Sequence, residues 1–338
     1  MPSSTSSSSG SAARRLRIPI LAAVLLVALV GALESIWRAQ GYQPSVADGK
    51  DRWSAQRDRV YGEKKLALVG DSRVMFNIET AVLRERLPGY EVAQLGIGAA
   101  LGAAVLRDLA RDEDFRGVVI ASMRAESFEP SQWESQQDFV DYYHEVWNTD
   151  RKLSEWLKTA LASRLVIMSP SVSIHRLASE WAEKGFLPKP WIVFHADRSI
   201  SADFSVRDVD LAVVRDVVQW HYRKATISAP REWLRAVGVV ETWTRRIQSR
   251  GGRVAIVRFP TAGPYWDLDQ RTYPRALYWD AFAARTSAVA IHFQDVPGMR
   301  SLPLPDASHV NYWDKPAFTE SLLDELVRAG LFPTAPGG

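Results

Sequence analysis

The stretch from Lys65 to Ser72 constrains the fold of this chain more than any other feature. Residues 66–69 are apolar and the run ends in Gly-Asp-Ser, so its length and boundary predict a buried strand that closes in a turn. In an open parallel sheet, functional side chains collect at the carboxyl ends of the strands. The sequence therefore predicts that Ser72 stands at such an edge, where a nucleophile would be placed.

The segment 304–309 supplies the other groups that a serine nucleophile needs. Asp306 precedes His309 by three residues, and a helical pattern from Lys315 to Arg328 follows. In a Ser/His/Asp triad the histidine takes the hydroxyl proton, and the aspartate fixes the imidazole tautomer and stabilises its charged form. We predict this triad for Ser72, His309 and Asp306, with His309 acting as base and then as acid. A helix N-cap at Ser72 and a polar surface loop at 304–309 are the structural alternatives.

Three blocks of the sequence, in this order, resemble the SGNH (GDSL-type) hydrolase superfamily. They are Gly70-Asp71-Ser72, the turn Leu95-Gly96-Ile97-Gly98 after the next strand, and Asp306-x-x-His309 near the end. The resemblance covers residues 61–331. It implies an α/β fold, with a three-layer α/β/α domain and a flavodoxin-like parallel sheet, and chemistry that moves or removes an acyl group on oxygen. It also implies an oxyanion hole formed by backbone N–H groups at Ser72 and at Gly98 or Gly96.

The chain departs from the family pattern at two arginines. Arg73 stands where the family usually has Leu, and Arg124 follows the predicted strand 117–121, where the family has the Asn that donates to the oxyanion. Loss of one such donor typically costs about 10²–10³ in rate, so a poor hydrolase and a different acyl acceptor both stay open. Arg124 or Arg73 is a candidate replacement for the missing Asn. In this departure the chain is similar to membrane-anchored members that esterify extracytoplasmic polymers.

The N-terminal part of the chain indicates a membrane anchor. Residues 1–17 are rich in small and polar residues and end in a basic cluster, which predicts a disordered cytoplasmic tail. Residues 18–37 are long and apolar enough to cross a hydrocarbon core of ~30 Å, and the positive-inside rule leaves the rest of the chain outside. We therefore expect a single-pass inner-membrane protein that contacts the lipid bilayer through residues 18–37. A cleaved signal peptide is the competing interpretation.

The remaining segments divide into a linker at 38–60, a periplasmic domain at 61–331 and a short tail at 332–338. Further strands are predicted at 91–95, 165–168, 253–258 and 288–293, and helices at 78–87 and 100–109. Residues 124–250 are predicted to form a helical insertion around the one strand at 165–168, with helices at 150–161, 174–185, 212–222 and 232–249.

The insertion holds eight of the thirteen tryptophans, which makes it a candidate for polymer contact or for packing near the bilayer, although core packing explains any single one of them. A loop at 261–275 faces the edge of the sheet that carries Ser72, so it would line the site. The residues expected to bind substrate or wall the pocket are Asp71, Arg73, Arg258, Tyr265, Trp266, Tyr312 and Trp313.

Composition and spacing argue against several classes of function. Cysteine is absent, the net charge is only +3, and the histidines show no metal-ligand spacing. We therefore expect no disulfide, no nucleic-acid partner and no bound metal. No phosphate-binding glycine motif follows a strand, so we expect no cofactor.

The leading hypothesis is a membrane-anchored periplasmic serine acyl-transfer enzyme. It would act on O-acyl groups, expected to be O-acetyl, of an envelope or exported polysaccharide. The resemblance suggests the acyl group, and the anchor and aromatic insertion suggest the glycan. Whether it is a transferase or an esterase stays open, as does a membrane partner that would supply acyl groups. The alternative is a non-catalytic scaffold or binding component of a polysaccharide assembly or acylation complex.

Overall fold

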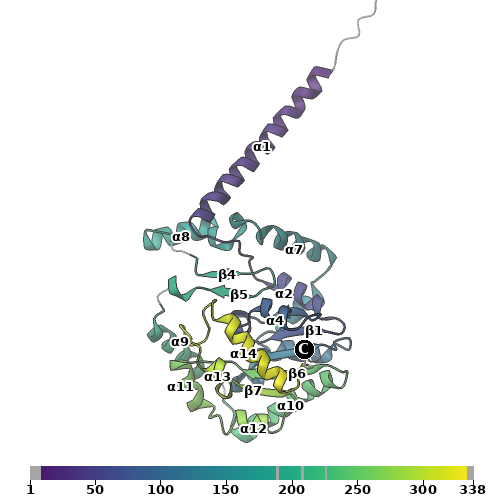
Figure 1. Cartoon of the computed structure of the whole chain (residues 1–338), viewed down its shortest axis with the longest axis vertical. Coiled ribbons are helices and arrows are strands. Elements are labelled where there is room, and N and C mark those ends of the chain that lie inside the picture. Colours follow the sequence, from purple (N-terminus) through teal and green to yellow (C-terminus); the bar gives the residue numbers. More distant parts are fainter. Residues whose placement is uncertain (1–8, 188–189, 207–208, 225–226, 333–338) are drawn as a thin grey trace, which may run out of the picture. The chain divides into compact units, whose positions relative to one another are not determined.

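The computed structural model describes residues 9–187, 190–206, 209–224 and 227–332 (Figure 1). The chain divides into two compact units, one formed by Met1–Ala47 and Thr159–Pro190, the other by Asp48–Lys158 and Trp191–Gly338. Helix α7, Thr149–Ala162, contributes residues to both units. This division differs from the expected one, in which residues 124–250 formed a single insertion.

The smaller unit is built on helix α1, Ser9–Ala39. Its segment Arg17–Ala39 has 23 residues and contains an 18-residue stretch with a mean hydropathy of 2.3, so it is long and apolar enough to cross a membrane. A signal sequence would satisfy the same criteria. Residues 9–17, which were expected to be disordered, are helical, because adding residues to an existing helix costs far less than nucleating one. The rest of that expected tail, and residues 333–338, lie outside the described residues.

The expected strand at 165–168 is wrong. The segment forms a 3-10 helix, and the elements of this unit that follow α1 are η4 Val166–Met168, η5 Pro170–Val172 and α8 Ile174–Lys184. The Glu34 carboxylate of α1 accepts hydrogen bonds from the backbone N–H groups of Val166 (2.9 Å) and Ile167 (3.2 Å). Two donors that a strand would give to a neighbouring strand are thereby satisfied by a side chain.

The larger unit contains a five-stranded parallel sheet in the order β2-β1-β3-β6-β7. Its strands are β1 Lys65–Val69, β2 Glu91–Gln94, β3 Val118–Ser122, β6 Arg253–Arg258 and β7 Val289–His292. Counted along the chain this is the 2-1-3-4-5 order of flavodoxin-like folds, whose topological switch point lies between β1 and β3. The predicted flavodoxin-like parallel sheet is confirmed.

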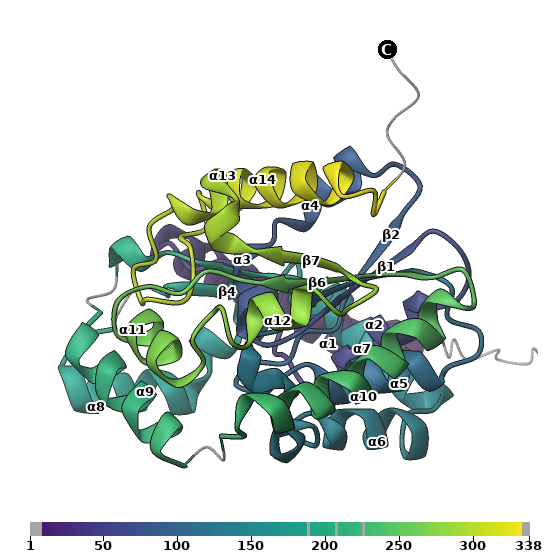
Figure 2. The same ribbon diagram turned by 90° about the horizontal axis from the view of Figure 1, so that it is seen from below.

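Helices cover both faces of the sheet, which gives the unit three layers and confirms the predicted α/β/α fold class (Figure 2). One face carries α3 Ser72–Asn77, α4 Thr80–Arg86, α13 Pro297–Arg300 and α14 Lys315–Arg328. The other face carries α2 Lys50–Arg57, α5 Ala103–Arg111, α6 Gln137–Glu145, α10 Pro230–Gln248 and α12 Trp279–Ala283.

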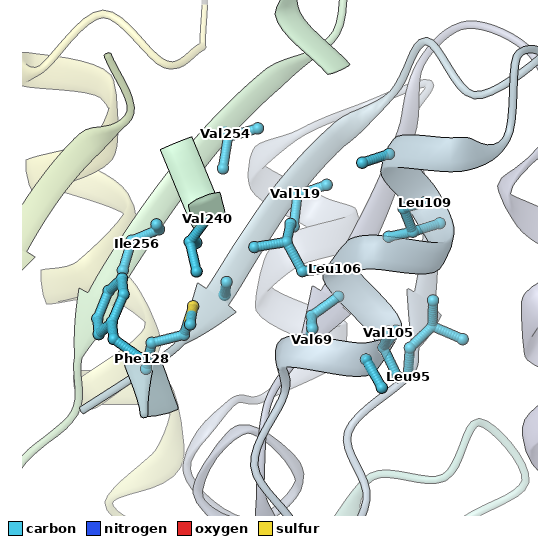
Figure 3. Packing of buried hydrophobic residues seen from close by; sticks show 14 of the residues in the cluster. Val69, Leu95, Val105, Leu106, Leu109, Val119, Phe128, Val240, Val254 and Ile256 are labelled. Atoms are coloured by element: carbon cyan, nitrogen blue, oxygen red, sulfur yellow. The ribbon is translucent and has the colours of Figure 1, made fainter. Parts of the chain in front are cut away.

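Each face of the sheet has its own hydrophobic core. In β1, Ala67 and Val69 belong to one core and Leu66 and Leu68 to the other, since successive side chains of a strand point to opposite faces. Figure 3 shows the first core, in which side chains of β1, β3 and β6 meet those of α5 and α10. A central strand covered on both sides must be apolar throughout, which is why a continuous apolar run predicted it.

Several elements lie outside these layers. Strands β4 and β5 form an antiparallel pair that was not predicted. The predicted helices of the insertion appear as α7, α8, α9 and α10. The remaining elements are β4 Ile192–Phe194, β5 Ile200–Ala202, α9 Leu211–Lys224, α11 Gly263–Thr272, η1 Asp58–Val60, η2 Ala125–Phe128, η3 Pro130–Gln132, η6 Phe204–Val206 and η7 Phe293–Asp295.

Residues 50–60, expected in a linker, belong to the core of the larger unit. Trp53 of α2 is fully buried and donates its indole N–H to the Leu95 carbonyl at 3.0 Å. Tryptophans of the expected insertion also pack inward, as Trp233 does, fully buried and bonded to the Ala125 carbonyl. Those of the insertion that are more than half exposed are Trp156, Trp181 and Trp220.

The end of β1 offers a test of this packing. Gly70 has a φ of 145°, and a Cβ there would lie 2.7 Å from the Cβ of Ser122. We expect Gly70→Ala to lower the free energy of unfolding by about 2–4 kcal/mol through overpacking and backbone strain. A Cβ at Gly238 in α10 would meet no atom within 4 Å outside its own stretch of helix. Gly238→Ala should therefore raise the free energy of unfolding by about 0.5–1 kcal/mol. Urea unfolding measures the free energy of unfolding of both variants. If the two substitutions change it equally, the close contact at Gly70 is contradicted.

Candidate active site

Ser72 is placed by the turn that follows β1. The strand ends at Val69, and Gly70 lets the backbone pass within contact distance of Ser122 in β3. The Asp71 carboxylate then accepts a hydrogen bond from the Arg73 backbone N–H (3.0 Å) and caps α3, whose first residue is Ser72. The serine therefore starts a helix at the carboxyl edge of the sheet, beside the switch point.

The structure brings the three predicted triad residues together. His309 Nε2 lies 2.9 Å from Ser72 Oγ, and His309 Nδ1 lies 2.7 Å from Asp306 Oδ2. An ionised carboxylate can only accept, so Nδ1–H donates to Asp306 and Nε2 is left to accept the Ser72 hydroxyl proton. This is the arrangement that lets an imidazole act as a general base toward a hydroxyl.

The Asp306 carboxylate is held as an anion. Its second oxygen accepts the backbone N–H groups of Ser308 (3.0 Å) and His309 (2.8 Å). Burial would raise the pKa of Asp306, but the hydrogen bond and charge of His309, together with these backbone donors, outweigh it and lower the pKa. The charged form that orients His309 is therefore the stable one at neutral pH.

Two residues that sequence reasoning missed hold the histidine loop against α3. The Phe76 ring lies 4.3 Å, centroid to centroid, from the His309 imidazole. The Val310 backbone N–H donates to Asn77 Oδ1 at 3.1 Å. Their position in the helix that follows the serine was the available signal, but only a structure shows that this helix meets residues 306–310.

The two predicted oxyanion glycines have different roles. A Cβ on Gly96 would lie 2.4 Å from a Val74 methyl group, so Gly96 serves close packing. Gly98 has open space around it and precedes residues 99–101, which line the same cavity as Ser72. Gln136, which was not predicted, supports this turn, since its amide donates to the carbonyls of Gly70 (2.9 Å) and Ala100 (3.3 Å).

Both candidate arginines lie at the site, each beside a carboxylate. Arg73 pairs with Asp71 at 2.5 Å, and Arg124 pairs with the fully buried Glu126 at 2.7 Å. The Arg73 guanidinium also lies over the Tyr265 ring. Burial would raise the pKa of Asp71, but the charges of Arg73 and Arg124 outweigh it and lower the pKa.

Four of the residues expected at the site do not line it. Arg258 is buried in an ion pair with Asp269 at 2.6 Å, and Trp266 packs on Phe293 with ring centroids 5.2 Å apart. The expected loop at 261–275 is largely helix α11, so only one side of it, with Tyr265, faces the cavity. Tyr312 and Trp313 are exposed and contact each other, and neither lines the cavity.

The cavity that contains Ser72 has a volume of about 450 Å³, within the range of ligand sites. It lies entirely in the larger unit. Besides the triad it is lined by polar residues and by an apolar wall that was not predicted. The wall consists of Trp191, Phe204, Val209, Val213, Val214, Val217, Val218 and Trp220.

No protein-family model matches this chain, and no curated protein does either. Among solved structures, one described as the crystal structure of TesA is similar over 78% of this chain and 99% of that chain. The sequence identity is 13% and the TM-score is 0.34. A likeness this distant carries no argument about fold or chemistry, which rest on the strand order and on the geometry of the site.

The charge of Asp71 gives a pH-dependent prediction. At pH 7 we expect Asp71→Asn to lower the free energy of unfolding by about 2–4 kcal/mol, because the buried Arg73 loses its ion-pair partner. The lowered pKa means that this contribution is complete above the unfolded value of ~3.9 and is lost as the pH falls through the folded value.

The difference in the free energy of unfolding between wild type and Asp71→Asn should therefore become smaller only below about pH 4. Urea unfolding at pH 7, 5 and 3 measures it. Asp267→Asn, which changes an exposed carboxylate of α11, is the control and should stay within ~0.5 kcal/mol of wild type. If the free energies of unfolding of Asp71→Asn and wild type differ by the same amount at every pH, the charge assigned to Asp71 is wrong.

Proposed function

We propose that this protein is a serine acyl-transfer enzyme of the SGNH type. The observation that carries the proposal is the chain of hydrogen bonds from Ser72 Oγ through His309 to Asp306. The flavodoxin-like strand order supports it, since Ser72 follows β1 at the switch point, where sheets of this kind bind ligands. The cavity beside the serine supports it further, because it gives a substrate access to the hydroxyl.

In the proposed reaction, His309 Nε2 takes the Ser72 proton while Oγ forms a bond to the acyl carbon. The carbonyl oxygen becomes an oxyanion, which backbone N–H groups at Ser72 and Gly98 and the Arg124 guanidinium would stabilise. Collapse breaks the bond to the leaving oxygen, and His309 returns the proton to it. Water or a hydroxyl group then attacks the acyl-enzyme with His309 again serving as base, the bond between the acyl carbon and Ser72 Oγ breaks, and His309 returns the proton to Oγ. Attack by water makes the protein an esterase, and attack by a hydroxyl group makes it a transferase.

The cellular setting is part of the proposal. We place the enzyme in the inner membrane, anchored by α1, with the larger unit on the periplasmic side because basic residues precede the span. A glycan hydroxyl is the proposed acyl acceptor or ester alcohol, and a membrane partner would supply acyl groups to a transferase. The support for the glycan is the anchor and the aromatic insertion, and the support for the acyl group is the resemblance.

The nucleophile is tested with full-length protein in lipid nanodiscs and p-nitrophenyl acetate. Ser72→Ala and Asp306→Asn should each lose about 10³-fold or more in turnover, because one removes the attacking atom and the other the group that fixes the imidazole tautomer. Intact mass should show an acetyl-sized gain on wild type, mapped to the Ser72 peptide, unless deacylation is too fast to trap.

Ser249→Ala, at an exposed position after α10, is the matched control and should behave as wild type. If Ser72→Ala turns over the ester as fast as wild type does, the triad is not catalytic. The scaffold or binding component would then be the better account of the fold.

Arg124 has a separate test, because an oxyanion donor acts only in the transition state. We expect Arg124→Ala to lower kcat by about 10²–10³ with little change in KM. The double variant Arg124→Ala/Glu126→Gln removes the buried carboxylate that would lose its partner, and should show the same loss if the guanidinium acts on the oxyanion. Arg246→Ala, in the exposed part of α10, is the control. A raised KM at unchanged kcat would assign Arg124 to substrate binding instead.

A further inference from the structure

The cavity at Ser72 joins two chemically different surfaces. Its lining includes the triad and the charged side chains of Asp71, Arg73 and Arg124. It also includes the apolar wall, five of whose eight residues belong to α9. One continuous cavity therefore offers a reactive centre and an extended surface that cannot satisfy hydroxyl groups.

The α9 part of this wall is open to solvent. Val213, Val217 and Trp220 follow one another at i, i+4 and i+7, so they share one face of the helix. They are 58%, 57% and 56% exposed. Val218 of the same helix is buried, and α9 packs against α11, so the helix is held in place while Val213 and Val217 remain exposed. Contiguous exposed apolar side chains around a cavity mark a binding surface, whereas scattered ones do not.

We propose that this wall binds the hydrocarbon chain of the acyl group that Ser72 receives, so that the substrate is an ester of a medium-chain fatty acid. The inference rests on the proposed function and names its substrate class. The wall runs about 10 Å along α9 from Val213 to Trp220, so the acetyl group expected from the sequence would leave most of it uncovered. An alkyl chain would cover it and remove it from water.

We assign the hydrocarbon chain to the acyl side of the ester. The polar residues Gln132 and Ser135 line the cavity as well and suit a hydroxyl-bearing alcohol or acceptor. In the transfer step, Ser72 Oγ bonds to the acyl carbon, the ester C–O bond breaks, and His309 gives the Ser72 proton to the departing oxygen. The chain stays on Ser72, against α9, until water or a hydroxyl group releases it.

Two ester series test the inference on full-length protein in lipid nanodiscs. In p-nitrophenyl esters from acetate to octanoate the leaving group is constant, and kcat/KM should rise about fourfold for each methylene that the wall buries. In alkyl acetates from ethyl to octyl the acyl group is constant, and kcat/KM should change little. The Ser72→Ala background is subtracted from both series.

A matched pair of valine variants separates the wall from general effects. Val217→Asn should lower the octanoate-to-acetate ratio of kcat/KM about tenfold. Val239→Asn makes the same change at an exposed valine of α10 that does not line the cavity, and should leave the ratio as in wild type. Partition of the longer esters into lipid affects both variants equally, so it cancels in the comparison.

Each outcome decides between the two proposals. Ser72-dependent turnover that is fastest with acetate, a rise only in the alkyl acetate series, or equal ratios in the two valine variants would overturn the medium-chain assignment and leave the acyl-transfer function standing. Absence of Ser72-dependent turnover with every ester would overturn the acyl-transfer function itself. In that case isothermal titration of wild type, Val217→Asn and Val239→Asn with decanoate still tests the wall, and equal affinities would overturn it.

Discussion

The close approach of backbone at Gly70 is the constraint on which the site depends. A Cβ on Gly70 would overlap Ser122 of β3, and a Cβ on Gly102, just before α5, would lie 2.9 Å from the Gly70 Cα. The Gly70 carbonyl accepts the Ile97 backbone N–H (3.0 Å) and the Gln136 amide (2.9 Å). The turn before Ser72 is therefore fixed on several sides, and the serine hydroxyl is held where His309 can reach it.

The charges around the serine are arranged in pairs, and this limits what each can do. Arg73 and Arg124 are both almost buried, and an unpaired guanidinium there would be costly, so Asp71 and Glu126 lie beside them. The negative charges of Asp71 and Glu126 offset most of the positive electrostatic potential that the two arginines would produce at an oxyanion. Any help from Arg124 to the oxyanion must therefore come from directed N–H groups more than from net charge.

Sequence reasoning reached the features that one local pattern determines. The buried parallel strands are continuous apolar runs. Ser72 follows a strand end, and Asp306 and His309 stand in a distinctive loop, so it could be predicted that these three residues meet. The strand predicted at 165–168 was wrong. There, backbone N–H groups of the apolar run donate to the carboxylate of Glu34, which lies more than a hundred residues earlier in the chain. Sequence reasoning also failed for Arg258 and Tyr312, because no local pattern tells whether a residue near a strand end pairs internally, turns outward or faces the cavity.

The α9 wall is a second feature whose role the local sequence pattern does not determine. Apolar residues at i, i+4 and i+7 of a helix that also carries exposed charged residues, such as Arg215, would ordinarily predict that the stripe faces a core. Here part of the stripe faces a cavity that contains the candidate nucleophile. A core and an occupied ligand site remove apolar surface from water equally well, so the sequence pattern cannot distinguish them. What distinguishes them is the exposed area left when the chain is folded alone, and in α9 that area lies beside Ser72.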